Sequence, residues 1–134
     1  MYDEKLGVVF PQPLLWKDIK GFEGYYQVCN YGKARSLDRW ISYESRGATV
    51  TRLFSGRELL PKLDKDGYFS FAIGKEKCKK YFRLHRMIAQ TFTPHEDELN
   101  LVVDHIDGDV NNNCLWNLQW LTSGDNTIKY YAEQ

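Results

Sequence analysis

The chain has 134 residues, with 18 Lys and Arg against 18 Asp and Glu and a formal net charge of zero. This length suits one compact domain or two small modules, and it excludes a two-domain enzyme with a nucleotide-binding fold. Hydrophobic residues make up 43% and aromatic residues 15% of the chain, which is too many for a disordered protein. No apolar run approaches the roughly 18 residues of a membrane span, and the acidic first residues do not resemble a secretory signal, so we expect a cytosolic protein.

The first 41 residues are predicted to form a small antiparallel module behind an irregular arm. Pro11 and Pro13 interrupt the short apolar stretches of residues 1–15, which indicates an arm without regular structure. Glycine-containing turns then separate segments typical of short strands, which we predict at 16–19, 25–29 and 33–37. Residues 42–56 are rich in Ser, Thr, Gly and Arg and show no clear period, so we expect a loop or linker there.

The middle of the chain is predicted to be an aromatic-rich meander that leads into one helix. Hairpin turns are expected at 64–67 and 74–77, between extended segments at 58–63, 68–73 and 79–84. Leu84, Ile88 and Phe92 then recur every four residues, which is typical of the apolar stripe of a helix. Pro94 follows directly and predicts that the helix ends before it.

The carboxyl-terminal residues have the order strand, loop, strand, helix. Strands are predicted at 101–103 and 118–121, with a loop dense in Asp and Asn over 104–113 and an N-cap at Thr122 or Ser123 for the closing helix. We therefore predict an α+β protein with a small antiparallel, β-rich N-terminal region. Its predicted division is a module at 1–41, a linker at 42–56, and a domain at 57–134 with the β-β-α unit at 101–132.

Charge is unevenly distributed along the chain although its sum is zero. Residues 33–86 hold fourteen basic and six acidic side chains, whereas residues 91–134 hold one basic and eight acidic ones. A basic surface beside an acidic region suits a polyanion-binding face next to a cation site, because phosphates repel carboxylates unless a cation lies between them. A dipolar solvated surface explains the same charges equally well. The candidate phosphate contacts are Lys33, Arg35, Arg39, Arg52, Lys79, Lys80, Arg83 and Arg86.

Four polar residues of the β-β-α unit carry the candidate chemistry. Asp104 and His105 stand at the end of its first strand, Asn117 at the start of the second, and Asn126 in the first turns of the helix. A hairpin packed on a helix can aim the end of its first strand at the helix face, so Asp104 and Asn126 can offer two oxygen ligands to Mg²⁺. His105 then activates water, while Asn117 holds either the imidazole or the loop by hydrogen bonding.

Several stretches of the chain together resemble a known family. Residues 104–113, 116–122 and 125–126 resemble the motif of the HNH nucleases of the phage and intron homing-endonuclease group. Residues 84–92 look like the helix that precedes this motif in the same group, and residues 16–39 resemble a small nuclease-associated module that often stands ahead of it. The order of two linked motifs is far more specific than either motif alone.

The resemblance implies a ββα-metal nuclease unit, also called a His-Me finger, that hydrolyses double-stranded DNA. In such a unit His105 is the general base, Asp104 and Asn126 are metal ligands, and Asn117 steadies the loop. One divalent cation is implied, Mg²⁺ with Mn²⁺ as a substitute, and no structural zinc is expected. One active site per chain predicts a monomer or weak dimer that nicks DNA, with no membrane involved.

Other polar residues are given ordinary roles. Asp107, Asp109 and the asparagines at 111–113 are common turn formers, and we assign them no catalytic work. His85 either hydrogen-bonds in the core or reaches a phosphate, and we favour the structural role. The three cysteines form no Cys-x-x-Cys pair and are interpreted as small buried hydrophobic residues. Two alternatives stay open: a DNA-binding regulator with a catalytically inactive HNH fold, and an enzyme that acts on RNA or structured DNA.

Overall fold

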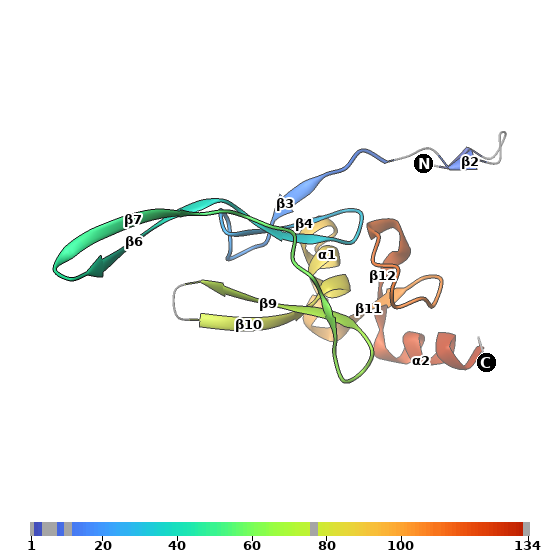
Figure 1. The fold of residues 1–134 in the computed structure, drawn as a ribbon. Helices are drawn as coiled ribbons and strands as arrows, with labels where there is room; N and C mark the ends of the chain where they lie inside the picture. Colours follow the sequence, from blue (N-terminus) through green and yellow to red (C-terminus); the bar gives the residue numbers. More distant parts are fainter. Residues whose placement is uncertain (1, 4–7, 10–11, 76–77, 133–134) are drawn as a thin grey trace.

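The computed structural model describes residues 2–3, 8–9, 12–75 and 78–132 and is drawn in Figure 1. Its helices are α1 (Leu84–Phe92) and α2 (Ser123–Ala132), with 3-10 turns at Glu98–Asn100 and Leu115–Asn117. Its strands are β1 (Tyr2–Asp3), β2 (Val8–Val9), β3 (Trp16–Asp18), β4 (Tyr26–Cys29), β5 (Ala34–Ser36), β6 (Arg39–Ser45), β7 (Ala48–Phe54), β8 (Lys62–Leu63), β9 (Phe69–Lys75), β10 (Cys78–Arg83), β11 (Leu101–His105) and β12 (Leu118–Thr122). No helix within these ranges is both long and apolar enough to cross a membrane.

Antiparallel pairing joins strands that are neighbours along the chain. β3, β4 and β5 form one sheet and β8, β9 and β10 another, while β11 and β12 make a hairpin of their own. The predicted α+β class is confirmed, and so is the helix predicted from the apolar stripe at 84–92. Most predicted strands lie within two residues of their expected positions, but only the end of the segment at 58–63 is a strand, β8.

The loop or linker expected at 42–56 is wrong, because these residues form most of a regular hairpin, β6 and β7. Figure 1 shows it projecting far beyond the rest of the fold. Its tip is a tight turn in which Arg46 has φ 50° and Gly47 has φ 78°, the backbone typical of a type I′ hairpin turn. Polar side chains pair across the strands, such as the Ser42 and Thr51 hydroxyls 2.8 Å apart. Both faces of the ribbon are largely solvent-exposed, so the apolar alternation that reveals a half-buried strand never arises.

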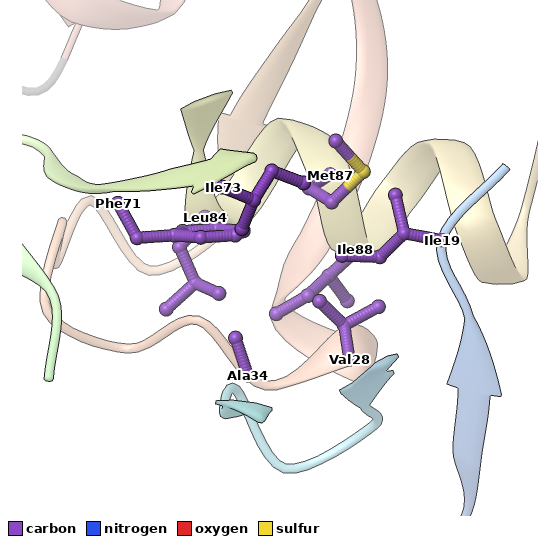
Figure 2. Close-up of a cluster of buried hydrophobic side chains, with 8 residues drawn as sticks. All are labelled: Ile19, Val28, Ala34, Phe71, Ile73, Leu84, Met87 and Ile88. Atoms are coloured by element: carbon purple, nitrogen blue, oxygen red, sulfur yellow. The ribbon is translucent and has the colours of Figure 1, made fainter. Parts of the chain in front are cut away.

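A single hydrophobic core, centred on α1, joins the amino-terminal sheet to the rest of the fold. Figure 2 shows Leu84, Met87 and Ile88 of α1 among its buried side chains. Phe71 and Ile73 reach this cluster from β9, and Ile19, Val28 and Ala34 reach it from the amino-terminal part. Burying each large aliphatic side chain contributes about 1.5–3 kcal/mol relative to exposing it, so this shared cluster fixes the amino-terminal sheet against α1.

Some sequence predictions fall partly outside the described residues. The irregular arm at 1–15 includes residues 1, 4–7 and 10–11, and the turn at 74–77 includes residues 76–77, all of which lie outside the described ranges. Within the arm, β1 pairs with β2. Cys29 is fully buried and Cys114 is half-buried, and the side chain of Cys78 lies outside the described part. Burial raises the pKa of the Cys114 thiol, and the neighbouring Cys29 raises it further.

Candidate active site

The β11–β12 hairpin and the start of α2 bring the predicted site residues to one place. β11 ends at His105, and the register sets Asp104 opposite Gln119 and His105 opposite Leu118. α2 follows β12 without a loop, and the Thr122 hydroxyl accepts a hydrogen bond of 3.1 Å from the Asp125 amide, as an N-cap does. This short connection folds α2 back beside the end of β11.

A cavity of about 260 Å³ lies between the end of β11 and α2. Asp104, His105 and Asn126 all line it, as the predicted metal and water site requires. Tyr68, Lys129 and Tyr130 line it as well, although the motif did not single them out. Asn117 does not line this cavity and lies behind the loop that follows β11.

The His105 imidazole is held in one orientation although it borders the cavity. It is 4% exposed, and its ring is stacked on Tyr68 with the ring centroids 6.1 Å apart. Its Nε2 lies 2.9 Å from the side-chain oxygen of Asn113. An amide oxygen can only accept a hydrogen bond, so Nε2 carries the proton and Nδ1 of the neutral ring keeps its lone pair. The hydrogen bond therefore selects the tautomer in which Nδ1 can act as a base.

Asp104 is a partly buried carboxylate with cationic and amide partners. Its Oδ2 accepts a hydrogen bond of 2.8 Å from the Gln119 amide and lies 3.3 Å from the Lys129 ammonium. The same ammonium donates to the His105 carbonyl at 3.1 Å. One carboxylate and one amide oxygen, from Asp104 and Asn126, are hard ligands of the kind Mg²⁺ accepts, with water and phosphate filling its remaining positions. The Lys129 ammonium already gives this carboxylate a positive partner.

Asn117 holds the loop after β11 in shape. Its side-chain oxygen accepts a hydrogen bond from the Asp107 amide at 3.1 Å, and its amide nitrogen donates at 2.9 Å both to the Asp107 carboxylate and to the Asn112 carbonyl. Hydrogen bonds from the Asn112 side chain, the Asp109 backbone and the Asn117 side chain lower the pKa of Asp107 to about 2. Of the two roles left open for Asn117, these contacts support the one in the loop.

Comparison with known proteins finds one family model that matches each half of the chain. A model described as the NUMOD4 motif matches residues 15–74, and one described as HNH endonuclease matches residues 82–128. The chain therefore contains an HNH endonuclease domain preceded by a NUMOD4 motif. The second match contains the cavity residues Asp104, His105 and Asn126, while the first contains β3 to β8 and almost all of β9.

Individual relatives agree with these two matches. DNA endonuclease I-HmuI of Bacillus phage SP01 is 39% identical over 107 residues, which are 80% of this chain and 52% of the relative. The uncharacterized HNH endonuclease L247 of Acanthamoeba polyphaga mimivirus is 32% identical over 84% of this chain and 25% of its own length. A solved structure reported as DNA binding and cleavage by the HNH homing endonuclease I-HmuI matches with a TM-score of 0.69 and 34% identity, over 89% of this chain and 59% of that one. The chain thus spans about half of I-HmuI and a smaller share of L247.

Two residues of the HNH domain that contact His105 were not assigned to the site from the sequence. Asn113, 5% exposed, provides the hydrogen bond described above, but in a run of three asparagines nothing distinguishes it from a turn former. His85 is 6% exposed, and its ring lies 4.7 Å from that of His105 and 5.0 Å from that of Tyr68. Its Nδ1 is buried without a hydrogen-bond partner. Burial, followed by the charges of His105, Arg83 and Arg86, lowers the pKa of His85 to about 3, so it is a neutral part of the packing.

The predicted phosphate contacts divide into two groups. Arg83 forms ion pairs with Asp64 at 2.8 Å and Asp66 at 2.6 Å, and Arg86 donates to the backbone carbonyls of Leu101 and Glu98, so both are engaged within the protein. The others lie on the hairpins and the amino-terminal sheet, several of them over aromatic rings: Arg35 on Trp16, Arg39 on Tyr25, Arg52 on Phe54 and Lys79 on Tyr81. Lys80 is exposed, and Lys33 is exposed 3.6 Å from Glu58.

Proposed function

We propose that this chain is a metal-dependent DNA endonuclease of the HNH type that nicks double-stranded DNA as a monomer. The observation that carries the proposal is the shared cavity of Asp104, His105 and Asn126, with His105 Nε2 lying 2.9 Å from the Asn113 side-chain oxygen. The match of residues 82–128 to the HNH endonuclease model and the relative named DNA endonuclease support the same activity. A relative from a Bacillus phage supports action in the cytoplasm of a bacterial cell.

His105 performs the proton transfer in this proposal. Its Nδ1 takes a proton from a water molecule whose oxygen attacks the phosphorus, and the bond from phosphorus to the leaving oxygen breaks. The Asn113 hydrogen bond keeps the ring oriented and stabilises the imidazolium that forms. Asp104 and Asn126 would hold one divalent cation, Mg²⁺ or Mn²⁺, which supplies charge stabilisation at the leaving oxygen when bound. Asn117 contributes by holding the loop that carries Asn113.

DNA binding is proposed for the predicted basic side chains other than Arg83 and Arg86. Figure 1 shows the β6–β7 and β9–β10 hairpins extending to the same side of α1. Cationic side chains of these hairpins and of the amino-terminal sheet can neutralise phosphates along a duplex. The proposed contacts are Lys33, Arg35, Arg39, Arg52, Lys79 and Lys80. In place of a linker, residues 42–56 are then an arm that reaches along the DNA.

Relaxation of supercoiled plasmid tests the activity. With Mg²⁺ or Mn²⁺ the wild-type chain should convert supercoiled plasmid to the open circle, and a chelator should prevent it. His105→Ala and Asp104→Ala should abolish nicking, whereas His95→Ala, which removes an exposed histidine outside the cavity, should leave it intact. Full activity of either cavity variant would refute the assigned roles.

A second candidate function is a DNA-binding regulator with an inactive HNH fold. The ion pair between Lys129 and Asp104 favours it, because the carboxylate needed for a cation already has a positive partner. This candidate predicts a gel shift with plasmid fragments and no nicking with Mg²⁺, Mn²⁺ or Co²⁺. Nicking that disappears in His105→Ala would exclude it. Cleavage of RNA or structured DNA in preference to duplex would instead identify a different substrate for the same site.

A further inference from the structure

We propose that the Asn30–Gly32 turn of the NUMOD4 motif positions His105 through Asn113, which makes this motif a structural part of the active site. The proposal rests on the proposed function for its catalytic consequence. Its structural content is a chain of contacts that runs from the amino-terminal sheet to the imidazole and can be tested without any reaction.

The first contact joins His105 to Asn113. Both side chains are buried, at 4% and 5% exposure, and the Nε2 to Oδ1 distance is 2.9 Å. A buried polar pair of this kind has little freedom, because water cannot replace either partner. Asn113 must therefore stay in place for the Nε2–H tautomer of His105 to be favoured. Asn113 is not in a strand or helix, so its position depends on what packs against it.

The second contact joins Asn113 to Gly32. A methyl group added at Gly32 would lie 3.0 Å from the Asn113 carbonyl carbon, 3.1 Å from its oxygen and 3.2 Å from its Cβ. The turn backbone therefore packs directly on Asn113, and a side chain at this position would fit only if Asn113 moved by a few tenths of an ångström. Gly32 also has φ +85°, a conformation that glycine adopts readily and other residues rarely do.

Further contacts between the Asn30–Gly32 turn and the segment that begins at Asn113 surround the contact of Gly32 with Asn113. The Leu115 amide donates to the Asn30 carbonyl at 2.9 Å, and the Cys114 thiol donates to the Tyr31 carbonyl at 3.7 Å. The Tyr31 and Trp116 rings meet edge to face with their centroids 5.0 Å apart. Each residue of the turn thus touches the segment that begins at Asn113, so the turn acts on this segment as a unit.

The turn is itself fixed by the chain before β3. Asn30 is 5% exposed; its side-chain oxygen accepts from the Leu15 amide at 3.0 Å, and its amide donates to the Pro13 carbonyl at 2.9 Å. The Gly32 amide closes the turn on the Cys29 carbonyl at 3.2 Å. A rigid turn of this kind can hold Asn113 in place, whereas a mobile loop would not.

Gly32→Ala tests this proposal, with Gly21→Ala as the matched control. Gly21 has φ +87°, close to that of Gly32, and lies in the same motif, but a methyl group there would meet nothing within 4 Å. Both variants therefore carry the same backbone strain, and only Gly32→Ala pushes on Asn113. The added methyl group requires Asn113 to move by a few tenths of an ångström, so we expect kcat for plasmid nicking to fall several-fold in Gly32→Ala, with KM for DNA unchanged. Gly21→Ala should keep the wild-type kcat.

The tautomer of His105 gives a readout that needs neither metal nor DNA. Nitrogen-15 NMR of the imidazole, recorded at a pH above its measured titration, distinguishes a proton on Nε2 from one on Nδ1. Wild type and Gly21→Ala should show the Nε2–H tautomer, and Gly32→Ala a mixture. Asn113→Ala should also give a mixture, whereas Asn113→Asp, which keeps an acceptor oxygen, should restore Nε2–H. If Gly32→Ala fails to fold, the two Asn113 variants still show whether Asn113 sets the tautomer of His105.

The possible outcomes separate this proposal from the proposed function. Wild-type kcat and an unchanged tautomer in folded Gly32→Ala would overturn the positioning role while leaving the nuclease assignment standing. An unchanged tautomer in Asn113→Ala would overturn it as well. If the wild-type chain fails to nick DNA, the proposed function falls, but the tautomer measurements still decide whether the turn positions His105.

Discussion

His85 makes the stability of the folded protein depend on pH in a way that one substitution should remove. Its imidazole is 6% exposed, and burial with the nearby positive charges lowers its pKa from 6.5 to about 3. The unfolded chain therefore binds a proton at this residue at a pH where the folded protein does not. The contribution of the neutral, buried ring is fully present above pH 6.5 and is lost as the pH falls towards about 3.

The magnitude follows from linkage. Each pH unit below 6.5 costs about 1.4 kcal/mol in the free energy of unfolding, so about 3 kcal/mol is lost at a pH two units lower. That is a large fraction of the 5–15 kcal/mol by which a typical domain is stable. His85→Phe keeps an aromatic ring against Tyr68 and His105 and removes the titrating group together with its unpaired Nδ1.

Urea unfolding of both proteins over a series of pH values measures this effect. Above about pH 7 the imidazole is neutral in both states, so the stability difference between wild type and His85→Phe should be constant there, which serves as an internal control. Below pH 6.5 the wild type should lose stability faster than the variant, with a difference in slope of about 1.4 kcal/mol per pH unit. Parallel curves down to about pH 4 would refute the idea that a neutral His85 is enforced by its surroundings.

Three other perturbations have expected outcomes. Lys129→Met removes the ammonium that pairs with Asp104, an ion pair worth about 1 kcal/mol that competes with a bound cation. Isothermal titration with Mn²⁺ in the absence of DNA should therefore show a several-fold tighter Kd for Mn²⁺ in the variant. A weaker Kd would mean that the lysine assists cation binding. Ile88→Ala opens a cavity at a fully buried position of α1 and should lower the free energy of unfolding by about 2–5 kcal/mol in urea denaturation. A loss under about 1 kcal/mol would contradict the packing of the amino-terminal sheet and α1 around one core. Arg39→Ala with Arg52→Ala should weaken DNA binding and reduce the slope of log Kd against log salt by about 2 in gel shifts, whereas an unchanged slope would remove both residues from the proposed interface.

The candidate catalytic residues could be identified from the sequence because they lie close together along the chain and their spacing matches a family pattern. Asp104 and His105 are neighbours at a strand end, and Asn126 follows within the same hairpin and helix, so local structure alone brings them to one cavity. The same holds for α1, whose apolar stripe is a local pattern. The roles of these residues in catalysis stay predictions until the variants are measured.

The long β6–β7 hairpin could not be predicted from apolar alternation. Alternation arises when one face of a strand is buried, and both faces of this ribbon are largely exposed. The one local signal was the turn, where Arg46 precedes Gly47, and it is weaker than the Asn-Gly and Asp-Gly pairs that usually identify such hairpins. A composition rich in Ser, Thr and Arg is compatible with a loop or with an exposed ribbon, and only the paired backbone distinguishes the two.

By itself the sequence determined the α+β class and the β-β-α order, because these follow from periodicity over short stretches of chain, and it indicated the motif residues through their resemblance to a family pattern. Tertiary structure decided which side chains surround His105. His85 lies on α1, Tyr68 directly precedes β9, and Asn113, eight residues along the chain from His105, packs against Gly32 of the amino-terminal motif. Contacts between segments so far apart depend on how the sheets pack around α1, and no local pattern of residues records that packing.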